Sequence, residues 1–391
     1  MIIIFRNVVF GCLMFFLCVH LSVAQQKNIE LNGLIVDESN YPVPYAAIGI
    51  PSKYIGTAST DEGSFYLLLS KENLSDSLEV SSIGYKSFKV KVEDFINKKE
   101  HTIVLIEEIV SLDEVQILKP AGYLKNAIKN LKNNTVSAKH ELNMLYRRFS
   151  VEHGKARFFT EHYLNILDRG PNAMELDRIE VVEGRKSADY RFVKTKQNVH
   201  AVSIMAKQNP IRRGVPIKNY KWSKIGDTSY DGEDVVIIEG RKGKNQYLRL
   251  YIGIDTYSVF KIETSALNAV YIYKKDKNGK LYLSYHNREW ISKKPINDLQ
   301  RRLLEVDSKA IKVSYRHEMF VLGLQTDKRK IKVKDFGGYG NDMGDVEVRY
   351  NPDFWNSFSL PPETAFYKKS VKELESIYGI PLETQFKLVN K

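Results

Sequence analysis

Hydrophobic and polar residues alternate in short runs over the first part of the chain. Turn residues such as Pro42, Pro44 and Gly84 separate these runs from one another. Alternation with a period of two is typical of strands that bury one face. The predicted strands are residues 29–36, 46–50, 56–60, 64–69, 77–83, 86–92 and 102–106. A series of short strands with close turns predicts a small antiparallel β-sandwich of the Greek-key kind.

A second and longer series of strand patterns follows residue 140. Sequences typical of hairpin turns connect them, for example Tyr230-Asp231-Gly232 and Asp276-Lys277-Asn278-Gly279. The predicted strands are residues 141–153, 156–167, 221–228, 234–240, 247–254, 259–266, 269–274, 281–290 and 311–323. Consecutive hairpins predict an antiparallel β-meander, so the fold class is mainly β with a few short helices.

Two segments have helical periodicity instead. Residues 121–134 carry an apolar stripe opposite three lysines, and Pro120 suits the first helical turn. We interpret this segment as a packing helix with a solvated basic face, the alternative being a helix on a membrane surface. A second helix is predicted to begin at a capping box, Ser370 to Glu373, and to end at Gly379.

The first 24 residues differ from the rest in composition. Arg6 is their only charge, a mostly apolar run follows it, and Ser22-Val23-Ala24 closes the segment. A basic start, an apolar core and small residues at the end are typical of a secretory signal. We therefore expect cleavage after Ala24 and a location in the periplasm or at the periphery of the outer membrane; a retained anchor helix is the alternative. Both cysteines of the chain lie in this segment, so the mature protein has no disulfide.

The acidic pair in Asp61-Glu62-Gly63 has three candidate roles: a calcium loop, a catalytic carboxylate pair, or a turn. A calcium loop needs oxygen ligands at alternate positions and a late glutamate. The apolar run that follows Gly63 supplies none. Glycine accepts the positive φ that a tight hairpin loop requires. We predict a structural turn at Asp61 and Gly63.

Several blocks of the first part occur in a familiar order. They are "GLIVDESNYPVPYAAIGIPSKYIGTASTDEGSFYLLL", "DSLEVSSIGYKSFKVKV" and "TIVLIEEIVSLDEVQI". Together they resemble a carboxypeptidase-regulatory-like domain of the kind found in Bacteroidetes envelope proteins. The resemblance implies a transthyretin-like sandwich that serves as a non-catalytic module. Farther on, "YIGIDTYSVFKIE" resembles the meander of the lipoprotein-carrier (Lol) half-barrel proteins.

These features divide the chain into four predicted parts. They are a signal peptide at residues 1–24, the regulatory-like sandwich at 25–118, a linker helix at 119–135, and a β-rich half-barrel-like domain with a C-terminal helix at 136–391. The chain carries a formal charge of +12. For an exported protein, this charge favours partners such as anionic lipid, lipopolysaccharide, cell-wall polymer or another envelope protein, and not nucleic acid.

The sequence has few patterns that are typical of catalytic sites. His286-Asn287-Arg288-Glu289 has the short spacing of zinc carboxypeptidase ligands, and His317 is the only later histidine. In a strand, however, residues three apart point to opposite faces. The chain has no glycine-rich phosphate loop, no nucleophile elbow and no cysteine after residue 24. We expect no catalytic residues, no metal and no cofactor.

Four lysines stand at alternate positions near the end of the meander: Lys328, Lys330, Lys332 and Lys334. In a strand all four would point one way. Lysines on an edge strand hinder aggregation between sheet edges, and the same strip could face the anionic groups of lipid or polysaccharide. Both interpretations remain open at this point.

Three functions are compatible with these observations. The first is a non-catalytic envelope protein that acts as a binding or assembly module. The second is a periplasmic carrier that holds a lipid or another amphiphile in its curved sheet. The third is a hydrolase whose site forms only in three dimensions.

Overall fold

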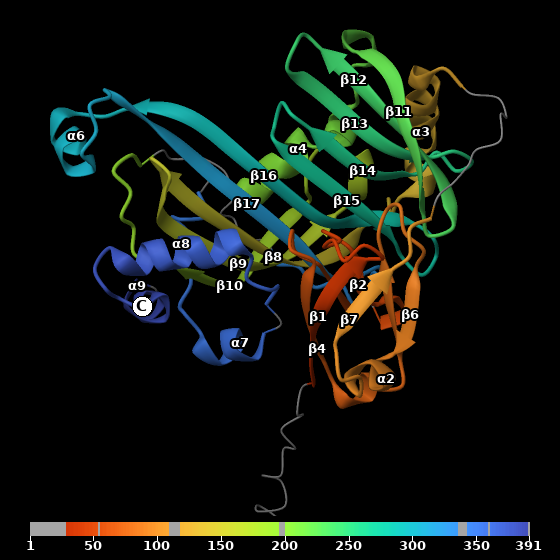
Figure 1. Ribbon diagram of the computed structural model, residues 1–391, viewed down its shortest axis with the longest axis horizontal. Coiled ribbons are helices and arrows are strands. Elements are labelled where there is room, and N and C mark those ends of the chain that lie inside the picture. The colour runs from red at the N-terminus through yellow and green to blue at the C-terminus, as the bar shows by residue number, and fades with distance from the viewer. Residues whose placement is uncertain are drawn as a thin grey trace, which may run out of the picture.

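The computed structural model describes residues 29–53, 55–108, 118–194, 200–334, 342–358 and 360–389. The predicted signal peptide, residues 1–24, lies outside them. A small sandwich lies against one large twisted sheet, and short helices cover both faces of that sheet (Figure 1). The protein is mainly β, as the hydrophobic pattern predicts.

The sandwich consists of two small sheets. The first has the order β4-β1-β7 and the second the order β3-β2-β5-β6. The strands are β1 (Ile29–Asp37), β2 (Ala47–Ile50), β3 (Ile55–Ala58), β4 (Ser64–Leu69), β5 (Ser77–Ser81), β6 (Phe88–Lys91) and β7 (Thr102–Leu105). The short helices η1 (Pro51–Lys53), η2 (Lys71–Asn73) and α2 (Val92–Ile96) connect them. All seven predicted strands are present.

One pairing in the sandwich differs from the expectation. β1 and β7 run parallel, with Leu34 opposite Thr102, whereas the sequence favoured antiparallel strands throughout. Parallel neighbours need a long crossover connection, and the chain between β1 and β7, which forms β2 to β6 and α2 on the way, supplies it. Apolar side chains from both sheets close a core that includes Leu31, Ile35, Phe65, Leu78 and Phe95.

The large sheet has ten antiparallel strands in the order β10-β9-β8-β17-β16-β15-β14-β13-β12-β11. They are β8 (His140–Glu152), β9 (Lys155–Asp168), β10 (Arg178–Lys186), β11 (Lys221–Tyr230), β12 (Glu233–Lys242), β13 (Gln246–Gly253), β14 (Val259–Thr264), β15 (Ala269–Lys275), β16 (Leu281–Pro295) and β17 (Ala310–Gln325). The predicted meander is confirmed from β11 to β17. β17 then pairs with β8, which joins the earlier hairpin to the meander.

Helices cover one face of this sheet, which we call the inner face. They are α3 (Pro120–Asn134), α4 (Ala201–Gln208) and α5 (Pro210–Arg213), with η3 (Gly170–Asn172) and η4 (Ile217–Asn219) nearby. Leu124, Ala127 and Leu131 of α3 lie in the core that α3 shares with β11 to β15. The lysines on the other side of α3 are exposed, so α3 is the packing helix that its periodicity predicts.

The sandwich and the C-terminal helices occupy the opposite, outer face. The helices are α7 (Pro352–Ser357), α8 (Ala365–Ser376) and α9 (Leu382–Val389), while α6 (Asp298–Leu304) lies at the tip of the β16–β17 hairpin (Figure 1). Tyr367, Leu374 and Phe386 pack against Phe149 and Phe159 of the sheet.

The predicted start of the helix at Ser370 is wrong. α8 begins at Ala365, five positions before the expected capping residue, because Thr364 accepts a hydrogen bond from the backbone N–H of Tyr367 at 3.0 Å. Ser370 is buried inside the helix instead of capping it. The predicted end is close, since Gly379 follows with a φ of +68°.

Candidate functional site

Asp61 and Gly63 lie in the turn between β3 and β4. Gly63 has a φ of +76°, and a Cβ atom there would lie 2.4 Å from the carbonyl oxygen of Ile35. The two acidic side chains of the turn reach across to the large domain. Asp61 pairs with Arg316 of β17 at 3.3 Å, and Glu62 accepts a hydrogen bond from the N–H of Ala365 at 3.0 Å. These carboxylates therefore hold the sandwich on the outer face.

The zinc-like residues do not come together. His286 is buried on the inner face, where its Nδ1 lies 2.8 Å from the carbonyl oxygen of Val270. Glu289 points to the opposite, outer face of β16, where it accepts a hydrogen bond from Asn268. His317 shares the inner face with His286, and its Nδ1 lies 2.7 Å from the hydroxyl of Tyr146. In the part of the chain that the structure describes, no group of three or more His, Cys, Asp or Glu side chains could hold a metal ion.

The four lysines do not lie on a strand, so the prediction that all four side chains point one way has lost its basis. Asp327 and the residues after it form a turn, in which the N–H of Lys330 bonds to the carbonyl oxygen of Asp327 at 2.9 Å. The following segment crosses the strand ends, and the N–H groups of Lys332 and Lys334 bond to Glu141 and Glu180. The alternating pattern failed because Asp327 stabilises a turn at the first two lysines.

The edges of the large sheet are β10 and β11, so the four lysines do not form an edge strand themselves. Their segment nevertheless contacts the edge strand β10 through the bond from Lys334 to Glu180. All four side chains, those of Lys328, Lys330, Lys332 and Lys334, are exposed.

A polar cluster that the sequence did not reveal lies buried on the inner face. His162 and His200 approach through Nδ1 and Nε2 at 3.0 Å, and Arg148 makes a two-pronged ion pair with Asp342 at 2.6 and 2.7 Å. Arg148 is fully buried and Asp342 is 5% exposed. Burial raises the pKa of Asp342, but the hydrogen bonds and the charge of Arg148 outweigh burial and set this pKa below its ordinary value.

The histidines of this cluster are neutral. Burial lowers the pKa of His200 and of His286 to about 3. It also lowers the pKa of His162 and of His317 well below the ordinary value. The charge of Arg148 lowers the pKa of His162, His200 and His317 further. The N–H of Val202 donates to Nδ1 of His200, which leaves the Nε2 hydrogen of neutral His200 to bond His162.

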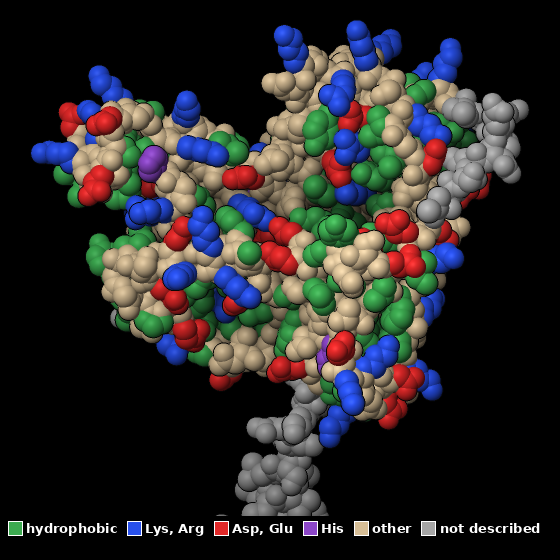
Figure 2. Space-filling view, in the orientation of Figure 1, with side chains coloured by type: hydrophobic (Ala, Val, Ile, Leu, Met, Phe, Trp, Pro, Cys, Tyr) green, Lys and Arg blue, Asp and Glu red, His purple; other side chains and the backbone are tan. Residues whose placement is uncertain are grey.

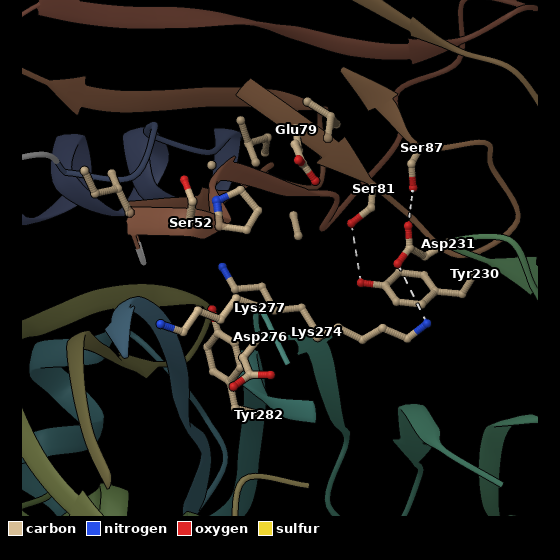
Figure 3. Close-up of a pocket in the computed structure, with 17 residues that line it drawn as sticks. Ser52, Glu79, Ser81, Ser87, Tyr230, Asp231, Lys274, Asp276, Lys277 and Tyr282 are labelled. Atoms are coloured by element: carbon tan, nitrogen blue, oxygen red, sulfur yellow. Dashed lines mark hydrogen bonds and ion pairs between the residues drawn. The ribbon is translucent and has the colours of Figure 1, made fainter. Parts of the chain in front are cut away.

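The clearest open site is the interdomain cleft, defined here as the hollow between β2, β3 and β5 of the sandwich and the Lys274–Tyr282 hairpin of the large sheet. Its volume is about 340 Å³. Ser52, Glu79, Ser81 and Ser87 line it from the sandwich side (Figure 3). The large domain contributes Tyr230, Asp231, Lys274, Lys275, Asp276, Lys277 and Tyr282.

Most charges in the interdomain cleft already have partners. Asp231 accepts a hydrogen bond from Ser87 at 3.0 Å and faces Lys275 at 3.7 Å. Glu79 pairs with Lys89 at 3.2 Å. Asp276 accepts two backbone N–H bonds within its own hairpin turn, at 2.9 and 2.8 Å. These carboxylates are therefore occupied.

Lys274 is the exception. Within the described residues it makes no ion pair, and its ammonium group lies 5.4 Å from the ring centre of Tyr282. Burial alone lowers its pKa to about 8, with no carboxylate close enough to raise it. A lysine desolvated beside an aromatic ring and without a counter-ion favours an incoming anion.

A second hollow lies on the outer face of the sheet. Its volume is about 380 Å³, and Tyr247, Glu263, Asn268, Glu289 and Arg316 are among its lining residues. Only some of its charges are paired: Glu263 bonds to Arg249 at 2.8 Å and Arg316 bonds to Asp61 at 3.3 Å. Arg288, which also lines this hollow, has a buried Nε without a hydrogen-bond partner. Figure 2 shows both signs of charge mixed over the visible face of the molecule.

Two small cavities on the inner face are lined by described residues. A cavity of about 30 Å³ lies under α4 between Met144, Met205 and Met319, and another of about 10 Å³ lies beside it near Arg212. The first has room for one or two waters. Among the helices that the structure describes, none is long and apolar enough to cross a membrane.

Comparison with known proteins gives one family model and several solved structures that match the chain. No curated protein matches the chain. Solved structures that match include a putative outer membrane lipoprotein-sorting protein domain from Vibrio parahaemolyticus, at 9% identity and a TM-score of 0.27 over 55% of this chain and 95% of that chain. A LolA superfamily protein from Nitrosomonas europaea matches at 14% identity and a TM-score of 0.26, over 56% of this chain and 100% of that chain.

A third similar structure is a DUF1329 family protein from Desulfovibrio piger, at 10% identity and a TM-score of 0.26, over 55% of this chain and 96% of that chain. The family model of the CarboxypepD_reg-like domain matches residues 31–117. That stretch coincides with the sandwich, so the N-terminal part of this chain is similar to a CarboxypepD_reg-like domain.

Proposed function

We propose that this chain is an exported, non-catalytic binding protein of the cell envelope, and that its ligand lies in the interdomain cleft. The single observation that carries the proposal is that both domains build the walls of this cleft. Export is inferred from the composition of residues 1–24. Pockets at domain interfaces that mix apolar side chains with a few polar groups are the usual form of small-molecule sites.

Contacts on two sides of the interdomain cleft support a fixed geometry. On one side Tyr45 stacks on Tyr285, with ring centres 4.7 Å apart. On the other side the N–H of Gly84 bonds to the carbonyl oxygen of Ser229 at 2.7 Å. Together these two contacts oppose rotation of the sandwich on the sheet. A cleft with fixed walls binds at a lower entropic cost than one that must form around its ligand.

The carrier hypothesis places the ligand on the inner face instead. The observation that favours it is the apolar, methionine-lined cavity under α4, since methionines adapt to ligands of different shape. An amphiphile larger than a few atoms would have to displace α4, because the cavity measures only about 30 Å³.

Fluorescence titration with N-phenyl-1-naphthylamine, a neutral apolar probe, distinguishes these sites in the full-length mature protein. Ala47→Trp on β2 and Ser52→Trp at the rim each fill the interdomain cleft, whereas Ala206→Phe fills the cavity under α4. We expect saturable binding that either cleft variant weakens at least tenfold and that Ala206→Phe leaves unchanged. The opposite pattern would favour the carrier, and binding that none of the three variants alters would refute both sites. Circular dichroism establishes that each variant is folded.

A further inference from the structure

We propose that the interdomain cleft selects an anionic amphiphile, a ligand with one carboxylate, sulfonate or phosphate group and an apolar body, and that Lys274 holds the anionic group. This inference rests on the proposed function of the cleft and assigns it a ligand class and a recognition residue.

The first argument is the position of the Lys274 ammonium group. It lies where β15 passes under β3, and a Cβ atom on Gly56 would lie 2.9 Å from Nζ. The same Cβ would lie 3.0 Å from the carbonyl oxygen of Ile48. A side chain at position 56 would therefore compete for the space that the ammonium group occupies. The glycine keeps this end of the cleft open for Nζ.

The second argument is the balance of charge. Three carboxylates and three lysines line the interdomain cleft. Glu79 is matched by Lys89 from outside, Asp231 by Lys275, and Asp276 by backbone N–H groups of its turn. None of them is left for Lys274. A desolvated ammonium group without a counter-ion is unfavourable, and an anionic ligand would remove that cost.

The third argument is the surface beside the ammonium group. Ile48, Ile55 and Val80 of the sandwich and the ring of Tyr282 line the same hollow. A small inorganic anion would leave these apolar groups uncovered, while an amphiphile would cover them and neutralise Lys274 together. A volume of about 340 Å³ suits a short single chain or a two-ring aromatic body.

The test compares two probes that share a naphthyl-anilino body. 8-Anilinonaphthalene-1-sulfonate carries one sulfonate, and N-phenyl-1-naphthylamine carries none. We expect Lys274→Met to weaken the sulfonate probe about tenfold or more, as for one charge-assisted hydrogen bond, and to change the neutral probe less than about twofold. Lys274→Arg should restore most of the affinity. Lys129→Met, on the exposed side of α3, is the control for a change of net charge.

Raising the pH is a second, independent readout. The sulfonate stays ionised, so its affinity should fall as Lys274 loses its proton above pH 8, and the neutral probe should not respond. The other charged groups facing the cleft are Glu79, Asp231, Lys275, Asp276 and Lys277. Tyr230 stays neutral over this range because burial raises its pKa to about 12.

The results of these titrations test the cleft as the binding site separately from the anionic amphiphile as its ligand. If Ala47→Trp and Ser52→Trp abolish both probes but Lys274→Met affects neither, the cleft is the site and the anion inference is wrong. If inorganic phosphate displaces the sulfonate probe completely, the ligand is a small anion and the amphiphile is refuted. If the cleft variants leave both probes bound, the proposed function itself fails.

Discussion

Mild acid should destabilise this protein strongly, because four neutral histidines are buried in the inner-face cluster. They are His162, His200, His286 and His317, each at most 3% exposed. Burial also lowers the pKa of His140, which adds to the effect of these four. The folded-state pKa values of the four lie below the unfolded value of about 6.5. A depressed histidine pKa means that the unfolded chain binds more protons, so stability is present above pH 6.5 and falls as the pH drops below it.

The size of the effect follows from linkage. Between pH 7.5 and 5.5, one histidine with an unfolded pKa of about 6.5 that stays neutral when folded costs about 1.4 kcal/mol. The four together cost roughly 5 kcal/mol, a large part of the 5–15 kcal/mol typical of a domain. Burial raises the pKa of Glu152 and Glu318, so these groups take up protons in the folded state and offset the loss at lower pH.

Urea denaturation of the mature protein at pH 7.5, 6.5 and 5.5, followed by tryptophan fluorescence, measures this effect. His286→Gln should reduce the pH dependence by about 1.4 kcal/mol over the window. His153→Gln replaces an exposed imidazole in the β8–β9 turn and is the matched control. A loss below roughly 1 kcal/mol in the wild-type protein would mean that the cluster accepts protons without unfolding, and the reasoning from burial would be refuted.

Asp342→Ala should cost about 3–5 kcal/mol in urea denaturation, since it leaves the buried Arg148 guanidinium unpaired; a cost under 1 kcal/mol would show that water reaches the pair. Gly63→Val should destabilise the sandwich by about 1–3 kcal/mol, because its φ of +76° strains any branched residue, and an unchanged melting temperature would contradict this. Changing Lys328, Lys330, Lys332 and Lys334 to Glu should weaken binding to anionic vesicles at low salt, with little difference near ~0.5 M salt where exposed charges are screened; equal binding at low salt would exclude the strip from membrane contact. Mass spectrometry of the exported protein should find Gln25 at the N-terminus, and a chain starting at Met1 would contradict cleavage.

The strands could be predicted from the sequence because they are amphipathic and end at turn residues. β10 was missed since charged residues such as Glu180, Glu183 and Arg185 interrupt its apolar pattern. Arg185 is nevertheless buried, where it pairs with Glu161 across the outer face. A local pattern cannot show that a charge will find a buried partner in another strand.

The candidate site could not be predicted from the sequence, for a related reason. Lys274 and Gly56 are distant in the chain, and each alone looks ordinary. The histidine cluster likewise depends on strand register, which places Arg288 opposite His317 on β16 and β17. Spacing along the chain did correctly separate His286 from Glu289, because that argument needs only the two-residue period of one strand.

The position of β17 has a consequence for how the chain matures. β17 lies between β8 and β16 although it is the last strand of the sheet to be made. Until it emerges, β8 to β10 and β11 to β16 are two separate sheets, each with an unpaired edge where β17 will lie. The sandwich cannot dock on the large sheet before β17 is made, because β3 packs against β17 and Asp61 pairs with Arg316 of β17. Chaperones that hold exported chains would therefore be needed until this one strand arrives, and a chain cut short before residue 310 should aggregate through those edges.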